Sequence, residues 1–381
     1  MSKTFKILSL DGGGIRGVIS ATILKKIETT LKEKKNGQKL HEYFDLIAGT
    51  STGSILAAGI ACQMEAQQLI NVYKEQGKDI FLESVRQQRK WRWLSQILGG
   101  YVLYPHERGE QGLAQVLKRN LIHQGKCPTI ADIKQPNLLI LAYDVLSRNT
   151  TWFANDDDKE WYYKNKTELW KICTASASAP TFFPPYELRR NSEEFLPHID
   201  GGVAANNPEL AAIAHALSMQ INDQGKTRPK IEEIAVLSIG TGRTTRPYEY
   251  SEIKKWGLLD WAKNIPNIFL DPSAENSNYI SRRIFNSIGS ENYLRLDFDL
   301  NEQFEPRQSG RPKKKLKKPY NKYVLKKDDK NYKCITEEMD NPEKCQDLIE
   351  AAECYLEYGE VAFKKQNIEV RSAIEQFIES H

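Results

Sequence analysis

One local pattern, a short apolar strand followed by a glycine-rich turn and a helix, occurs twice near the start of this chain and constrains its fold most. The first copy begins with the strand Phe5–Leu10, after which apolar residues recur at helical spacing from Ile15 to Leu31. The second copy runs from residues 44–48 through Gly49–Gly53 into a small apolar helix over residues 55–61. Strands that are each followed by a helix predict an α/β fold.

Two later segments extend this prediction. Residues 138–143 and 234–239 are almost wholly apolar, as expected for strands that are covered on both faces. The chain has 381 residues, of which 40% are hydrophobic and 27% charged. This composition supports a substantial core and excludes wholesale disorder. We therefore predict an α/β domain with a mostly parallel central sheet.

The second glycine-rich turn, Gly49-Thr-Ser-Thr-Gly53, has the G-x-S-x-G pattern of a nucleophile elbow. The glycines allow a sharp turn that presents the Ser51 hydroxyl at the carboxyl edge of the sheet, next to the positive end of the following helix. Ser51 is therefore a candidate nucleophile. A second interpretation stays open at this stage, in which Thr50 or Ser51 only caps that helix.

A triple glycine follows the first strand, in the run Asp11-Gly-Gly-Gly-Ile-Arg-Gly17. An oxyanion hole needs free backbone amides that converge on one point, and consecutive glycines at a helix start supply them without obstruction by a Cβ atom. We expect the amides of Gly12, Gly13 and Gly14 to form such a hole. Arg16 is expected to anchor the loop or to hold negative charge.

The same loop also fits a dinucleotide-binding fingerprint, because Gly12, Gly14 and Gly17 have the spacing G-x-G-x-x-G. That fingerprint requires an acidic residue about 20 positions further on, at the tip of a second strand. The acids present, Glu28 and Glu33, fall in or beside the same predicted helix. An oxyanion hole is favoured. The alternative is a non-catalytic module that recognises a ligand, such as a nucleotide, through the loop Gly12–Gly17.

An aspartate on a glycine turn provides a candidate base. In His198-Ile-Asp-Gly-Gly202, Asp200 ends a short apolar segment, where its carboxylate is suited to accept the Ser51 proton. The alternative is a turn aspartate that bonds to its own backbone. His215 completes the order Ser, Asp, His of another hydrolase class, but it lies in an apolar helical run. We expect the chemistry to need neither His198 nor His215.

These residues resemble the patatin-like phospholipase family, whose glycine-rich block, nucleophile elbow and dyad aspartate motif occur here in the family's order. Ala175–Pro184 is similar to the stretch that shapes the acyl site in patatins, and Tyr293-Leu-Arg295 is similar to their late strand. The resemblance covers residues 5–300. It implies a three-layer α/β/α sandwich and lipid acyl hydrolysis by a dyad of Ser51 and Asp200, with no metal and no cofactor.

The resemblance also implies partners. Membrane phospholipids or lysophospholipids are the expected substrates, and no nucleic acid partner is expected. Soluble members of similar length act in bacterial defence against phage, where a cyclic nucleotide switches on membrane degradation. A cyclic nucleotide activator and a homodimer therefore stay open. The N-terminus lacks a signal-peptide pattern and no apolar run of about 18 residues occurs, so we expect a cytoplasmic protein that acts at the membrane surface.

The composition changes beyond residue 300. Residues 311–333 hold eleven basic residues against two acidic ones, which predicts a solvated loop or, as the alternative, an anion-binding patch for acidic lipid headgroups or nucleic acid. Apolar residues between positions 342 and 380 predict closing helices. We therefore divide the chain into a catalytic domain over residues 1–300 and a basic insertion with closing helices over residues 301–381, which we expect to pack on the same domain.

Two further features bear on the setting of the protein. Residues 81–104 mix apolar side chains, including tryptophans, with arginines. This mixture suits a lipid interface or, alternatively, a surface helix whose aromatic residues pack inward. The six cysteines are scattered without a CxxC pair, which favours a reducing compartment over a zinc site or a disulfide framework.

Overall fold

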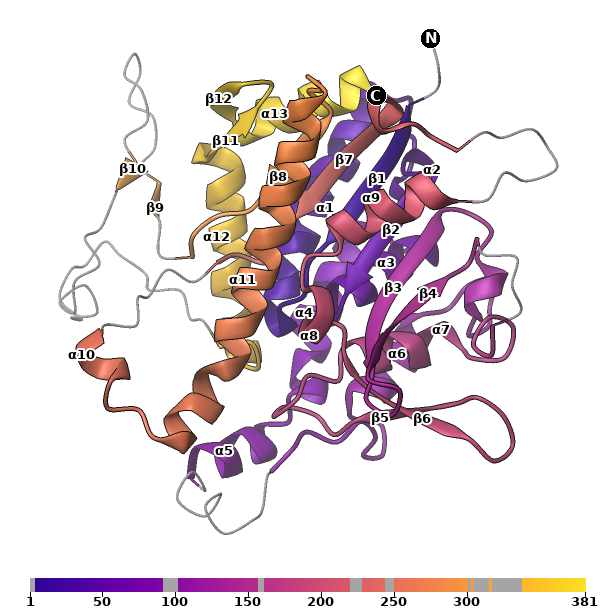
Figure 1. The fold of residues 1–381 in the computed structure, drawn as a ribbon, viewed down its shortest axis with the longest axis vertical. Helices are drawn as coiled ribbons and strands as arrows, with labels where there is room; N and C mark the ends of the chain where they lie inside the picture. Colours follow the sequence, from indigo (N-terminus) through magenta and orange to yellow (C-terminus); the bar gives the residue numbers. More distant parts are fainter. Residues whose placement is uncertain are drawn as a thin grey trace.

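The computed structural model has a central sheet covered by helices on both faces (Figure 1). It describes residues 4–91, 102–156, 161–219, 228–243, 250–300, 303–304, 315–316 and 338–381. Within these residues the main sheet has eight strands, in the order β5-β6-β3-β2-β1-β7-β8 with β4 beside β3. The strands are β1 (Phe5–Leu10), β2 (Leu46–Thr50), β3 (Asn137–Asp144), β4 (Asn149–Ala154), β5 (Tyr186–Arg189), β6 (Phe195–Asp200), β7 (Ile234–Ile239) and β8 (Tyr293–Leu296).

The helices vary widely in length, and two small hairpins lie outside the main sheet. The longer helices are α1 (Gly17–Lys34), α3 (Thr52–Ala61), α4 (Ala66–Ile80), α5 (Glu83–Trp91), α6 (Leu113–Asn120), α7 (Leu169–Ser176), α9 (Glu209–Ser218), α11 (Leu258–Ser287), α12 (Cys345–Tyr358) and α13 (Val370–Ser380). The short ones are α2 (Leu40–Tyr43), α8 (Gly202–Ala205), α10 (Tyr250–Ile253) and the 3-10 turns η1 (Gly14–Arg16), η3 (Ile130–Asp132), η4 (Ile231–Glu233) and η6 (Pro342–Lys344). The hairpins pair β9 (Gln303–Phe304) with β10 (Lys315–Leu316) and β11 (Glu360–Phe363) with β12 (Gln366–Glu369).

Alternate residues of the central strands enter two separate cores, because successive side chains of a strand point to opposite faces. Leu8, Leu10 and Ile47 join the core formed with α1, α3 and α4. Ile7 and Leu46 join the core under α9 and α11. The molecule is therefore a three-layer α/β/α sandwich, and the predicted fold class is confirmed.

Five neighbouring strands, β3, β2, β1, β7 and β8, run parallel. The strands expected over residues 5–10 and 234–239 are found as β1 and β7. The strand expected over residues 44–48 is shifted to Leu46–Thr50, because Phe44 still belongs to the end of α2. The carboxyl end of β2 therefore leads directly into Ser51.

The last two helices close one face of the molecule. Helices α12 and α13 pack against α1, and Phe298 stacks on Tyr355 of α12 with ring centroids 4.6 Å apart. The basic run over residues 311–333 lies outside the described residues except for Lys315 and Leu316. The chain that follows it returns to the core of the sandwich.

The segment that mixes arginine with aromatic residues is described only in part, since residues 92–101 lie outside the described residues. Phe81 and Leu82 are buried. Arg86 is also buried and forms ion pairs with Glu83 and Glu343. These side chains pack inward. The two interpretations of the segment also depend on Trp91 and Trp93, whose side chains lie outside the described part of the structure, so both stay predictions. Among the described residues, no helix is both long enough and apolar enough to cross a membrane.

Candidate active site

Ser51 lies in the turn between β2 and α3, at the carboxyl edge of the parallel strands. Its φ angle is 54°, in the left-handed region that costs a non-glycine residue free energy and often marks functional sites. The flanking glycines make the turn sterically feasible. A Cβ on Gly49 would overlap the carbonyl oxygen of Gly53, and a Cβ on Gly53 would overlap that of Leu10.

The hydroxyls of this turn do not cap the helix. Ser51 occupies the N-cap position of α3, but its side chain makes no capping hydrogen bond. The Thr50 hydroxyl donates to the Ala205 carbonyl over 2.8 Å. The interpretation of the motif as a simple helix cap is therefore wrong, because both side chains have partners elsewhere.

The end of β2 meets the end of β6 on the same side of β3. Thr50 lies opposite Leu141, and the next residue of β3, Ala142, lies opposite Asp200. The two strands therefore approach each other end to end along one longer strand. The Ser51 hydroxyl forms a hydrogen bond with the Asp200 carboxylate. The topology of the sheet thus brings the two candidate residues into contact.

Asp200 is almost inaccessible, with 5% of its surface exposed, and Ser51 is exposed by 8%. The Gly202 amide donates to Asp200 Oδ1 over 2.7 Å. Burial raises the pKa of the Asp200 carboxyl from 3.8 to about 6, because the charged form loses hydration, while the hydrogen bonds from Ser51 and Gly202 act in the opposite direction. A carboxylate with a raised pKa is a stronger base at neutral pH.

The triple-glycine loop lies against Ser51, since a Cβ on Gly12 would come within 3.1 Å of Ser51 Cβ. The Gly12 amide donates to the Asn206 carbonyl over 3.0 Å. The expectation that Gly12 is an oxyanion donor is therefore wrong, because this bond ties the loop to the end of α8. Within the described part of the chain, the amides of Gly13 and Gly14 have no acceptor, and these two donors remain for an oxyanion.

Arg16 and Met339 hold the far side of the loop. The Arg16 amide donates to the Gly13 carbonyl over 3.2 Å, and its side chain is buried. The Met339 carbonyl accepts the Ile15 amide over 2.8 Å. A Cβ on Gly14, whose φ is 59°, would overlap that same carbonyl. Met339 could not be foreseen as a contact, because it follows the basic insertion and belongs to no motif.

A buried ion pair anchors the first residue of the loop. Asp11 accepts two hydrogen bonds from Arg295 of β8, over 2.8 and 2.5 Å. Arg295 also donates to Ser238 Oγ of β7 over 2.8 Å. Paired donors and acceptors of this kind fix geometry as well as charge. The loop is therefore tied to the ends of three strands, a function of Arg295 that the sequence did not reveal.

The stretch Ala175–Pro184 contacts the backbone of both candidate residues. The Ser51 amide donates to the Ser176 hydroxyl over 3.0 Å. The Asp200 amide donates to the Ser178 carbonyl over 3.0 Å. Sequence reasoning did not single out Ser176, because a serine among alanines matches no motif.

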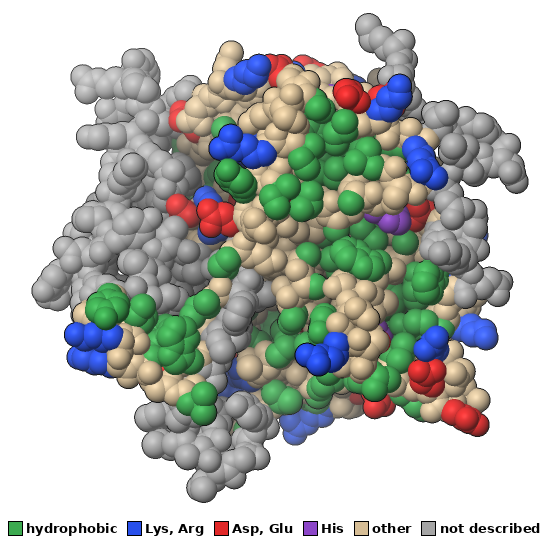
Figure 2. Space-filling model, in the orientation of Figure 1, with side chains coloured by type: hydrophobic (Ala, Val, Ile, Leu, Met, Phe, Trp, Pro, Cys, Tyr) green, Lys and Arg blue, Asp and Glu red, His purple; other side chains and the backbone are tan. Residues whose placement is uncertain are grey.

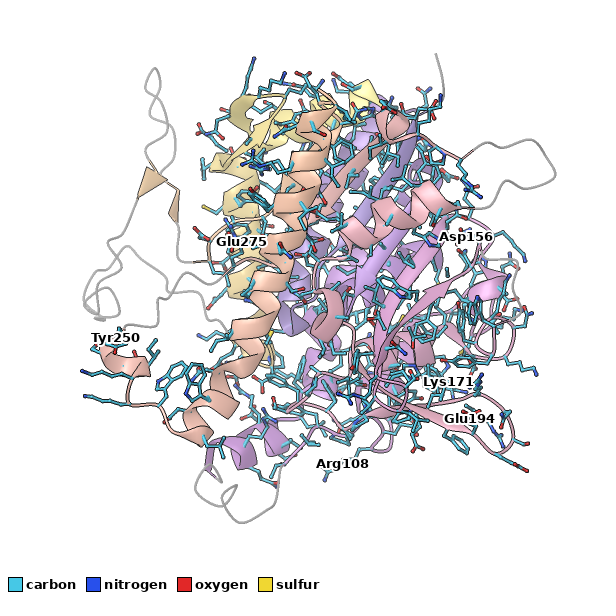
Figure 3. The ribbon with its side chains drawn as sticks, viewed as in Figure 1. Arg108, Asp156, Lys171, Glu194, Tyr250 and Glu275 are labelled. Atoms are coloured by element: carbon cyan, nitrogen blue, oxygen red, sulfur yellow. The ribbon has the colours of Figure 1, made fainter. Side chains whose placement is uncertain are left out.

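Neither histidine considered from the sequence contacts the Ser51 hydroxyl or the Asp200 carboxylate. His198 bonds through its ring nitrogens to a backbone carbonyl and to the Thr151 hydroxyl. His215 pairs with Asp156 over 2.9 Å, beside the end of α9 (Figure 3). A Ser-Asp-His triad is therefore not formed. Across the residues that the structure describes, no group of three or more His, Cys, Asp or Glu side chains is arranged to hold a metal ion.

Comparisons with known proteins find similar sequences and structures. The family model described as patatin-like phospholipase matches residues 8–213. Patatin-like protein 1 of Arabidopsis thaliana is 33% identical over 327 residues, which are 78% of this chain and 75% of that protein. A potato (Solanum tuberosum) protein named probable inactive patatin-3-Kuras 1 is 30% identical over 314 residues, which are 76% of this chain and 77% of that protein. Human GIVD cytosolic phospholipase A2, solved with methyl gamma-linolenyl fluorophosphonate, matches with a TM-score of 0.42 and 13% identity, over 99% of this chain and 58% of that one.

Proposed function

Because this chain belongs to the patatin-like phospholipase family, we propose that it is a lipid acyl hydrolase that cleaves carboxylic esters of membrane glycerolipids, as a phospholipase A or lysophospholipase does. Family membership alone does not establish catalysis, since one relative is named probable inactive. The observation that supports catalysis in this chain is the hydrogen bond between the Ser51 hydroxyl and the buried Asp200 carboxylate.

The proposed first half-reaction forms an acyl-enzyme. Asp200 takes the proton of Ser51 as Oγ attacks the ester carbonyl, and the Gly13 and Gly14 amides stabilise the oxyanion. The tetrahedral intermediate then expels the alcohol or lysolipid, which receives the proton from Asp200. In the second half-reaction Asp200 takes a proton from water, and the resulting hydroxide attacks the acyl carbonyl. The fatty acid leaves, and the proton returns to Ser51.

Release of fatty acid from mixed phospholipid vesicles, followed by mass spectrometry of the products, tests this proposal. A soluble p-nitrophenyl ester provides a second substrate that needs no membrane. The alternative hypothesis, a non-catalytic module that binds a nucleotide through the loop Gly12–Gly17, predicts no release and nucleotide binding that requires Gly14. Two features count against that alternative: the Gly12 amide is already bonded, and the Met339 carbonyl fills the space beside Gly14.

The pH dependence of the reaction follows from the proposed base. Asp200 must be ionised to accept a proton, and burial raises its pKa to about 6. We expect kcat/KM for the soluble ester to be constant above that value and to fall tenfold per pH unit below it. A pH–rate profile checks this expectation. An acidic limb near pH 4, the range of an exposed aspartate, would contradict it.

Action at a membrane surface is supported by exposed apolar side chains on the catalytic side of the molecule. Ser273 of α11 accepts the Asn206 amide over 3.4 Å, close to the glycine loop. Helix α11 begins at Leu258. At a rise of 1.5 Å per residue, Leu258 and Ser273 are about 22 Å apart along the helix axis. Figure 1 shows the first turns of this helix extending past the lower edge of the sheet. Leu258 is 86% exposed and Trp261 43%. Apolar and basic side chains gather over this end in Figure 2, and aromatic residues beside lysines favour lipid interfaces.

Replacement of Leu258 by aspartate together with Trp261→Ala is expected to weaken vesicle binding and vesicle hydrolysis about tenfold or more, because each apolar side chain contributes roughly 1.5–3 kcal/mol when buried. Hydrolysis of the soluble ester should stay unchanged. An aspartate in the first turn of a helix is favourable, so folding should not suffer. The matched control is Tyr279→Asp, which changes an aromatic residue of the same helix that is 57% exposed. Equal vesicle binding by the double variant and wild type would contradict the proposal that Leu258 and Trp261 contact the membrane.

The predictions of regulation rest on the resemblance, and the prediction of location rests on sequence patterns. A cyclic nucleotide activator, a role in defence against phage, a homodimer and a cytoplasmic location stay predictions. For the activator, hydrolysis rates are to be compared with and without a panel of cyclic dinucleotides. Equal rates would count against it.

A further inference from the structure

We propose that Ser176 is a positioning residue, whose hydroxyl holds the backbone of Ser51 in reach of Asp200. The inference rests on the proposed function, since it concerns the same reaction. Ser176 is the last residue of α7 and is completely buried. Its hydroxyl bonds to the backbone atoms Ser51 N and Leu141 O, so its effect on the reaction is exerted through the nucleophile.

The Ser176 hydroxyl is inserted between two strands. It accepts the Ser51 amide over 3.0 Å and donates to the Leu141 carbonyl over 2.6 Å. Thr50, opposite Leu141, is the last residue of β2 that pairs with β3. Beyond it the chain turns away into α3, so the Ser51 amide cannot continue the ladder directly. The Ser176 hydroxyl bridges the Ser51 amide to Leu141 of β3, the strand with which β2 pairs.

The same residue also holds the other half of the dyad. The Ser176 carbonyl accepts the amide of Gly201 over 3.1 Å. Gly201 has no room for a side chain, because a Cβ there would overlap the carbonyl oxygen of Leu141. Ser176, Leu141 and the turn after Asp200 are therefore in contact at the junction of β2, β3 and β6. One residue fixes the backbone on both sides of the hydrogen bond between Ser51 and Asp200.

The backbone conformation of Ser51 explains why the hydrogen bond from its amide to the Ser176 hydroxyl matters for the position of the nucleophile. With φ of 54°, the backbone is held in a region that non-glycine residues avoid and that persists only where surrounding contacts determine it. Removal of the Ser176 hydroxyl leaves a buried amide and a buried carbonyl without this partner. We expect the turn to relax and the Ser51 hydroxyl to move relative to Asp200. A misplacement of about 1 Å in a catalytic group typically costs about 100-fold in rate.

The test is the kinetics of Ser176→Ala on the soluble ester. We expect kcat to fall about 10- to 100-fold with KM within about twofold of wild type. The acidic limb of the pH profile should move upward, because the hydrogen bond from Ser51 stabilises the ionised form of Asp200 and its loss raises the carboxyl pKa. The rate at which a fluorophosphonate labels Ser51 should fall in parallel with kcat.

Thr174→Ala is the matched control. Thr174 is also a buried hydroxyl residue of α7, but its side chain donates within the helix, to the Trp170 carbonyl over 2.8 Å. This variant should lose stability without a change in kcat or in the acidic limb. If Ser176→Ala fails to fold, Ser176→Cys keeps a similar volume with a weaker acceptor, and the same changes are expected at smaller size.

The outcomes separate this inference from the proposed function. Wild type that neither hydrolyses esters nor reacts with the fluorophosphonate overturns both. Active wild type with kcat, labelling rate and acidic limb unchanged in a folded Ser176 variant overturns the positioning function alone. Equal losses of kcat in Ser176→Ala and Thr174→Ala, without movement of the acidic limb, also overturn it, since general destabilisation then explains the loss.

Discussion

Replacement of Ser51 by alanine is expected to lower kcat by about 10⁴- to 10⁶-fold, because the reaction loses its nucleophile and no acyl-enzyme forms. The loss should be equal on phospholipid vesicles and on the soluble ester, since both require the same attack on a carbonyl. Active-site titration with a fluorophosphonate should give no covalent adduct. Vesicle binding should stay intact, because the exposed end of α11 is untouched.

The fold of this variant should be preserved. The Ser176 hydroxyl bonds to the backbone amide of residue 51, which alanine retains. Ser218→Ala, at an exposed serine of α9, is a control for the effect of removing a hydroxyl elsewhere. Retention of more than a tenth of the wild-type rate in folded Ser51→Ala would exclude Ser51 as the nucleophile.

Replacement of Asp200 by asparagine is expected to lower kcat by about 10⁴-fold, because an amide of nearly the same shape cannot take the Ser51 proton at any pH of interest. The acidic limb near pH 6 should disappear from whatever activity is left. Measurement of kcat over pH 4–9 for both proteins checks this. Substantial activity in Asp200→Asn with the same acidic limb would show that another group is the base.

The same substitution should change how stability depends on pH. Burial raises the Asp200 pKa from 3.8 to about 6 in the folded state, so ionisation is disfavoured there relative to the unfolded chain. This contribution to stability is fully present below about pH 4 and is lost as pH rises through 6, by up to about 3 kcal/mol. We expect the unfolding free energy of wild type to fall relative to that of Asp200→Asn over this range. Parallel denaturant titrations at pH 4 and 8 check the difference.

Much of the fold could be predicted because its signals are local. The strands over residues 5–10 and 234–239 are continuous apolar runs, and Ser51 and Asp200 lie in short motifs whose glycines impose turns. Burial on both faces of a parallel sheet produces such runs whatever the rest of the chain does. Strand β2 begins two residues later than predicted, because the end of α2 occupies the preceding residues. Element boundaries depend on such neighbouring contacts.

The contacts that complete the site could not be predicted, because they depend on register between distant segments. The Gly12 amide is bonded to the Asn206 carbonyl. No local sequence pattern shows which of the three glycine amides already has an acceptor. Ser176 gains its position only because β3 extends past the end of β2, so that β6 can continue beside it. Such an arrangement follows from tertiary packing and leaves no periodicity in the sequence.

The contact of Met339 with Ile15 and Gly14 joins the last quarter of the chain to its first turn. The family match ends at residue 213, yet this carbonyl supports the loop that borders the nucleophile. A shortened protein cut to the matched region would therefore lack one wall of its own reaction centre. The chain beyond residue 213 therefore supports the reaction centre structurally. A displacement of this part of the chain would first change the position of the loop that contains Gly13 and Gly14.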